Sequence, residues 1–199
     1  MRITECDIWT VVVPARAGTV NSEEYGPATW DHVPKHIIRL QTDEGLYGIG
    51  ETGRGVGRGA VEAAAASLVG LDPRRICLQD LPIAIGRAEG AATGRSHEGV
   101  HGNGRINPAY DAFEMAVFDL VGRAVGLPVH ALLGGKVRDR VAVDYWIGQM
   151  SPSDAARAAG EAKARGFHGL KMKCAIDDPW EARVQAILDA AGQIGRAHV

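Results

Sequence analysis

The chain has 199 residues, 46% of them hydrophobic and 23% charged, which is the composition of a globular protein with one large or two small domains. Its 22 basic and 24 acidic side chains leave a net charge of -2, so nothing indicates a nucleic-acid partner or a membrane surface. No apolar stretch approaches the ~20 residues of a membrane span, and residues 1–7 lack a signal-peptide core. The three cysteines lie far apart in the sequence. We therefore expect a cytoplasmic location.

The N-terminal part of the chain predicts three antiparallel strands. Residues 3–13 are rich in β-branched side chains and end at Pro14, where a strand stops. Residues 35–42 alternate as a second strand, and Asp43-Glu44-Gly45 makes the turn into a third strand at 46–51. Because so small a sheet is not stable alone, helices must pack on it.

The predicted connection between the first two strands is unusually long. Residues 15–34 contain glycine and proline, but they also carry Tyr25 and Trp30. A long loop with aromatic side chains inside a compact domain is more often functional than idle. The two aromatic residues are therefore candidates for substrate contact, with simple packing of the domain as the alternative.

Helices follow the strands. Residues 56–69 contain a run of alanines, whereas residues 83–107 are rich in glycine and their pattern assigns no element. Residues 108–125 give the clearest helix, because apolar side chains recur at helical spacing and Gly126 can end it. The helical pattern then breaks, and we expect a domain boundary near Lys136.

After this boundary the pattern changes to an alternation of strands and helices. We expect strands at 141–147 and 170–174, each followed by a helix, at 152–165 and at about 179–191. Ser151 is placed to cap the first of these helices. Strand-helix-strand-helix with short connections implies parallel strands. Two such units leave an open sheet edge, so we expect the sequence to stop within a repeating architecture.

The most informative motif is Lys171-Met172-Lys173 in the last predicted strand. Side chains alternate in a strand, so the two lysines point the same way, roughly 7 Å apart. Two ammonium groups this close lower each other's proton affinity, and such a lysine can take a proton from carbon near neutral pH. On an isolated strand the pair would usually mark a solvated face, but in a parallel sheet covered on both faces it needs an anion or a cleft. Cys174 is expected to point the other way as a buried thiol.

A second motif, Gly48-Ile49-Gly50-Glu51-Thr52-Gly53, fits the dinucleotide fingerprint G-x-G-x-x-G. Its strand follows a hairpin turn instead of starting a parallel unit, and no strand ending in an acidic residue follows at the expected distance. We therefore interpret these glycines as hairpin and loop residues. A complete nucleotide-binding domain remains a weaker alternative hypothesis for the chain.

Three segments together resemble the enolase superfamily, in its mandelate racemase and muconate-lactonizing branch. The first is Thr42–Glu51, and the second is Ala112–Leu120, which continues to Gly126-Leu127-Pro128 and to Leu132-Leu133-Gly134-Gly135. The third is the Lys171–Lys173 motif, at the position of the family's second barrel strand. Each segment alone is modest, but their order and spacing make the combination specific.

The resemblance covers residues 1 to about 192 and implies a fold. Residues 1–135 are expected to form an α+β capping domain, a three-stranded antiparallel sheet with helices. Residues 136–192 would then be the first two β/α units of an incomplete, TIM-like (β/α)8 barrel, a fold of about 250 residues. Residues 194–199 read like a translated sequencing adapter, so we expect the tail 193–199 to be a non-native read-through.

The resemblance also implies the site. Lys173 is expected to be the base that removes the proton alpha to a substrate carboxylate, and Lys171 to contact that carboxylate or a metal-bound oxygen. The family pairs such a base with Mg²⁺, which stabilises the enediolate. Its three carboxylate ligands come from the third, fourth and fifth barrel strands, so no metal ligand is expected in this chain.

Other substrate contacts are expected around the barrel mouth. Either Tyr145 or Trp146, at the end of the first barrel strand, would face the site, while the other packs on helices. Arg54 and Arg58 would line the mouth, or else be solvated loop residues. The loop that carries Tyr25 and Trp30 would be the family's specificity element.

The sequence thus predicts the N-terminal part of a Mg²⁺-dependent enzyme acting on a small-molecule carboxylate, a sugar acid or hydroxy acid. Dehydration of a sugar acid is the first choice, because that chemistry is widespread in the branch. Racemisation, epimerisation and cycloisomerisation stay open. The rival hypothesis is a catalytically inert truncated product, since the metal-ligand strands are not in this chain. For a full-length protein the resemblance implies a homo-oligomer.

Overall fold

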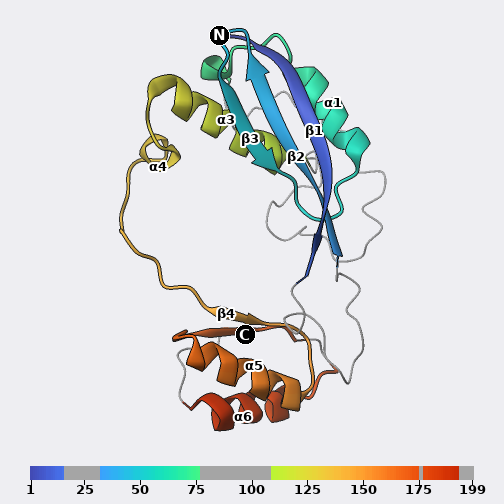
Figure 1. Ribbon diagram of the computed structural model, residues 1–199, viewed down its shortest axis with the longest axis vertical. Helices are drawn as coiled ribbons and strands as arrows, with labels where there is room; N and C mark the ends of the chain where they lie inside the picture. The colour runs from blue at the N-terminus through green and yellow to red at the C-terminus, as the bar shows by residue number, and fades with distance from the viewer. Residues whose placement is uncertain (16–31, 77–108, 175–176, 193–199) are drawn as a thin grey trace. The chain divides into compact units, whose positions relative to one another are not determined.

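The structure is a computed structural model that divides into two compact units (Figure 1). The first unit comprises residues 1–13 and 34–137, and the second consists chiefly of the residues after Val137. The structure describes residues 1–15, 32–76, 109–174 and 177–192. Tyr25, Trp30, the unassigned segment 83–107 and the tail 193–199 lie outside these described residues.

The first unit is built on a three-stranded sheet with the order β1-β2-β3. The strands are β1 (Ile3–Pro14), β2 (His32–Thr42) and β3 (Tyr47–Glu51). β2 and β3 pair antiparallel, as the sequence predicts, with Arg39 opposite Ile49. Gly45 adopts φ +76° in the turn between them, a backbone conformation that favours glycine.

Helices α1 (Arg58–Leu68) and α3 (Tyr110–Val125) pack on the sheet and confirm both predicted helices (Figure 1). A short helix, α4 (Val129–Leu132), and a 3-10 turn, η1 (Pro73–Arg75), were not predicted. The predicted apolar stripe of α3 is buried against alternate residues of β2 and one face of α1. The main side chains of this core are Ile38, Leu40, Val61, Leu68, Phe113, Val117 and Leu120.

Two glycines of β3 allow α3 to lie directly on the sheet. A Cβ added at Gly48 would lie 2.0 Å from the Ala116 carbonyl oxygen, and one at Gly50 would lie 1.8 Å from that of Ala112. Both glycines are buried residues of the β2–β3 hairpin, which confirms the hairpin interpretation, and they face α3, a contact that the sequence did not predict. Their lack of a side chain is a packing requirement of the helix-sheet contact.

This contact predicts that Gly50→Ala destabilises the first unit. The new methyl group would push the α3 backbone away from β3, which we expect to lower the free energy of unfolding by about 1–3 kcal/mol or more. Urea denaturation of the chain measures this. Gly53→Ala is the control, because nothing lies within 4 Å of its Cβ. Equal stability of the two variants would contradict the packing role of Gly50.

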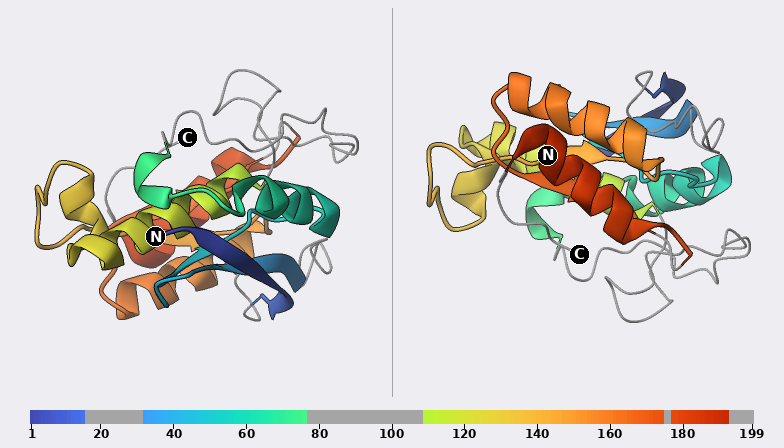
Figure 2. Two further views of the ribbon diagram at one scale, coloured as in Figure 1. Left: turned by 90° about the horizontal axis from the view of Figure 1, so that it is seen from above. Right: turned by 90° about the horizontal axis from the view of Figure 1, so that it is seen from below.

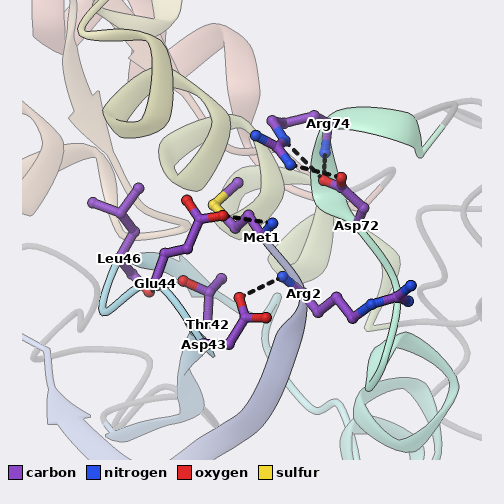
Figure 3. Close-up of polar contacts among 8 residues, drawn as sticks. All are labelled: Met1, Arg2, Thr42, Asp43, Glu44, Leu46, Asp72 and Arg74. Atoms are coloured by element: carbon purple, nitrogen blue, oxygen red, sulfur yellow. Dashed lines mark hydrogen bonds and ion pairs between the residues drawn. The ribbon is translucent and has the colours of Figure 1, made fainter.

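The start of β1 is fastened to the turn between β2 and β3 (Figure 3). The Arg2 amide donates to the Asp43 carboxylate at 2.7 Å, and the Asp43 amide donates back to the Arg2 carbonyl at 3.1 Å. The Met1 amino group pairs with Glu44 at 2.6 Å. These contacts hold the start of β1 next to the end of β2.

The second unit contains two parallel strands and two helices. Its elements are β4 (Tyr145–Ile147), α5 (Pro152–Ala164), β5 (Leu170–Met172) and α6 (Trp180–Ala191). The parallel pairing and both helices are confirmed, and the Ser151 hydroxyl accepts from the Asp154 amide at 3.2 Å as the predicted cap. The strands are shorter than predicted, because the ladder joins only 145–147 to 170–172. None of the helices in the described ranges is both long and apolar enough to cross a membrane.

One face of this small sheet carries the second core. Helices α5 and α6 run side by side (Figure 2) and pack on the same side of β4 and β5. The core joins strand side chains to the alanine-rich face of α5 and the end of α6: Tyr145, Ile147, Leu170, Ala155, Ala158, Ala159, Ala162 and Ala191. The small alanine side chains let α5 lie close to the strands.

Candidate functional site

Lys171, in β5, and Lys173, directly after it, point away from the helices. Leu170 is buried in the core with α5 and α6, whereas Lys171 and Lys173 are exposed. The strand alternation therefore puts both lysines on the opposite face from Leu170. Trp146 is the register partner of Lys171 in the parallel ladder, so it lies on the same face. The structure thus brings Lys171, Lys173 and Trp146 together on the sheet face that α5 and α6 leave open.

The backbone of Lys173 is held on both sides. Its amide donates to the Ile147 carbonyl at 3.0 Å, which extends the ladder one residue beyond β5. Its carbonyl accepts from Nη1 of Arg183, on α6, at 3.0 Å. The side chain of Lys173 therefore starts from a backbone position fixed by both a neighbouring strand and a helix.

Arg183 belongs to a polar network that sequence reasoning missed. Its Nη1 also lies 3.3 Å from Oδ2 of Asp178, and Oδ1 of Asp178 accepts from Gln149 at 2.8 Å. The sequence did contain a signal. Arg183 precedes Ile187 and Ala191 by four and eight residues, so it occupies the buried face of α6. A charged residue in that position indicates a specific partner.

Tyr145 lies on the other side of the sheet from the lysines. It is 8% exposed, and its ring meets that of Phe167 edge-on at a centroid distance of 5.2 Å. The structure therefore does not bring Tyr145 together with Lys171 and Lys173. Of the two aromatic residues of β4, Trp146 faces the lysine side.

The two predicted arginines belong to the first unit. Arg58 opens α1, where it pairs with Glu62 at 2.7 Å and donates to the Ile8 carbonyl at 3.3 Å. Arg54 lies in the exposed turn between β3 and α1. Arg58 thus fastens α1 to β1, which is a structural role within its own unit.

The described residues do not form a magnesium site. No group of three or more His, Cys, Asp or Glu side chains in the described ranges is arranged to hold a metal ion. Mg²⁺ requires several oxygen ligands in near-octahedral geometry. We therefore assign no chemical step of these residues to a bound metal.

A cavity in the second unit lies away from Lys171 and Lys173. A cavity of about 470 Å³ opens among residues that precede β4 and β5, including Asp144, Arg165, Phe167 and His168. Lys171 and Lys173 are not among its lining residues. Because these residues lie at the strand starts, the hollow is at the opposite end of the strands from Lys173.

Cys174 is exposed, so the expectation of a buried thiol is wrong. The hydrogen bonding of the strand ends one residue earlier, at the Lys173 amide, so strand alternation no longer determines which way Cys174 points. Cys6, in contrast, is partly buried against the first core. Burial, together with the nearby Asp7 carboxylate, raises the pKa of the Cys6 thiol from 9.0 to about 11.

Alkylation with iodoacetamide at pH 8 should therefore modify Cys174 well before Cys6. The thiolate is the reactive form, and Cys6 stays a protonated thiol until the pH approaches 11. Peptide mass mapping separates these two sites from Cys77. Labelling of Cys6 as fast as Cys174 in the folded chain would show that Cys6 is not held in the first core.

Comparison with known proteins gives consistent relatives. The family model for the mandelate racemase / muconate lactonizing enzyme N-terminal domain matches residues 27–134. A D-galactonate dehydratase of Ralstonia nicotianae is 35% identical over 141 residues, covering 68% of this chain and 34% of that protein. A D-galactonate dehydratase of Variovorax paradoxus is 30% identical over 168 residues, covering 77% and 41%.

Solved structures extend the similarity to the whole chain. A dipeptide epimerase of Cytophaga hutchinsonii, complexed with Mg and the dipeptide D-Ala-L-Val, has a TM-score of 0.75 at 23% identity. The alignment covers 100% of this chain and 51% of that one. The chain therefore spans about half the length of this solved structure and 34% to 41% of the two dehydratases.

Proposed function

The chain belongs to the mandelate racemase / muconate lactonizing enzyme family, and we propose that it is the N-terminal part of a sugar-acid dehydratase. Two dehydratases of D-galactonate, 35% and 30% identical to this chain, support that substrate class. On this proposal residues 1–135 form the capping domain, and residues 136–192 supply the first two β/α units of a barrel. The parallel β4–β5 pair with α5 and α6 on one side supports the second assignment.

The observation that carries the proposal is the placement of Lys171 and Lys173 on the sheet face opposite α5 and α6. In a closed barrel the helices cover the outside, so the face without helices is the interior. The carboxyl ends of barrel strands surround the active site, and Lys173 directly follows β5. Both amines would then project into the mouth of the barrel.

The chemistry requires a base and a stabilised anion. A proton on the carbon next to a carboxylate is very weakly acidic, and negative charge develops on the carboxylate oxygens as it leaves. Lys173 would take the C2 proton, and Lys171 would hold a carboxylate oxygen by a charge-assisted hydrogen bond. The C3 hydroxyl then leaves with one proton as water, so that the C2 proton and the C3 hydroxyl are eliminated together, and the resulting enol ketonises to the 2-keto-3-deoxy acid.

Two further parts of the site, the metal ligands and the contacts that set specificity, would be supplied by residues other than the lysine pair. Magnesium is present in the related dipeptide epimerase, and we propose that its ligands here lie beyond the described part of the chain. The loop with Tyr25 and Trp30, and Arg54 from the capping domain, are proposed to set substrate specificity. The substrate itself is a small carboxylate, either a sugar acid or a hydroxy acid.

Racemisation or epimerisation is the second candidate, and the similarity of fold to a dipeptide epimerase favours it. The first step is the same proton removal. The outcome differs, because a racemase returns a proton to the same carbon, whereas a dehydratase loses the neighbouring hydroxyl. Product analysis therefore distinguishes the two reactions.

We predict that Lys173→Met greatly slows proton removal. In the longest open reading frame that contains this chain, incubated with D-galactonate and Mg²⁺ in D₂O, NMR follows deuterium at C2 and formation of the keto acid. Loss of the base should lower kcat by about 10²–10⁴-fold. Lys171→Met should chiefly raise KM, because it removes a contact to the carboxylate that is present throughout binding.

Lys163→Met, an exposed position on α5, is the matched control and should keep full activity. Deuterium at C2 without loss of water would favour the racemase candidate. Wild-type turnover that survives Lys173→Met would refute the assigned base. No exchange on any α-hydroxy acid would favour the inert product.

A further inference from the structure

Arg183 is a fully buried cation with an incomplete set of partners. Its side chain is 0% exposed. Of its guanidinium nitrogens, Nη1 contacts the Lys173 carbonyl and Asp178, while Nε and Nη2 have no hydrogen-bond partner among the described residues. A guanidinium has five N–H donors, and the three on Nε and Nη2 have no acceptor within the described part of the chain.

Such a group is a poor choice for stability alone. Burying a charge costs free energy unless it is paired and hydrogen-bonded, and each unmet donor adds to that cost. Apolar side chains of similar size often replace a buried ion pair without loss of stability. The role of Arg183 therefore depends on what Nη1, its paired nitrogen among the described residues, holds in place.

That nitrogen holds the carboxyl end of β5. Nη1 donates to the Lys173 carbonyl at 3.0 Å and lies 3.3 Å from Asp178, which in turn accepts from Gln149, the second residue after β4. The network therefore links α6 to the chain at the ends of both strands. Lys173 lies one residue beyond β5, where the two-stranded ladder ends. The hydrogen bond from its amide to the Ile147 carbonyl is the last one of that ladder in the described residues.

We propose that Arg183 is a positioning residue that fixes the backbone of Lys173 and thereby aims its side chain. The catalytic consequence rests on the proposed function, in which Lys173 is the base. Ladder ends fray, and a small displacement of a reacting group can lower a rate by about 10²-fold. The hydrogen bond from α6 opposes that fraying at the residue where geometry matters most.

The first test measures backbone hydrogen exchange by NMR in this chain. Arg183→Met should speed exchange of the Lys173 amide roughly tenfold or more, because a hydrogen bond from a charged donor is lost. The Tyr145 amide is the internal control. It donates to the Gly169 carbonyl at 2.9 Å, at the other end of the same ladder, and its exchange should be unchanged.

Three variants guard against general effects. Arg183→Met leaves Asp178, whose side chain is 8% exposed, without its cation, so the pair Arg183→Met and Asp178→Asn removes both charges together. This double variant should fold and still show fast exchange only at Lys173. Arg183→Lys keeps a donor and should restore part of the protection. Arg157→Met, which removes the exposed partner of the buried Asp154 on α5, should change neither amide.

The second test measures turnover in the longer open reading frame. The double variant should lower kcat at least tenfold with little change in KM, and Arg183→Lys should recover part of it. Faster exchange at both Lys173 and Tyr145, or at neither, would overturn the proposal. So would selective exchange at Lys173 with unchanged kcat. If the wild-type enzyme has no activity, the proposed function fails, and the exchange data alone decide whether Arg183 fixes the strand end.

Discussion

The second unit depends on the one-sided burial of its two-stranded sheet. Alanines of α5 and the end of α6 pack against Tyr145, Ile147 and Leu170, and this contact decides which way every other side chain of the two strands points. Strand alternation then leaves Trp146, Lys171 and Lys173 on the other face. A shift of one residue in either strand would bury the lysines and expose the core, so burial specifies the register strongly. The proposed chemistry follows from that register.

The first unit depends on an equally close contact, between a helix and a strand. Gly48 and Gly50 let the α3 backbone lie on β3, at distances where any Cβ would collide with a carbonyl oxygen. The same stretch of sequence matches a nucleotide-binding fingerprint, yet its glycines serve packing inside an antiparallel sheet. Only the residue pattern of the motif resembles a phosphate-binding loop, because the surrounding elements differ from the strand-turn-helix that such a loop requires.

The sequence predicts features that depend on local signals. Ser151 and Gly126 mark helix ends through their own hydrogen bonding and backbone freedom, and the apolar spacing of α3 identifies its buried face. Features that depend on distant partners are harder to predict. Arg183 donates to a carbonyl ten residues earlier, just after β5, and Cys174 is exposed because it lies beyond the ladder. The choice between Tyr145 and Trp146 also depends on distant partners, because strand alternation separates the two side chains but the packing of α5 and α6 decides which one is buried.

The placement of both lysines on the sheet face opposite α5 and α6 can be tested by nuclear Overhauser effects, measured on this chain with its lysine and alanine side chains labelled. The account predicts contacts between the Lys171 side chain and the indole ring of Trp146, its partner across the ladder. It also predicts none between either lysine and the buried methyl groups of Ala158 and Ala162. Contacts from Lys171 or Lys173 to those methyl groups would contradict it, because they would put the lysines on the face that α5 and α6 cover.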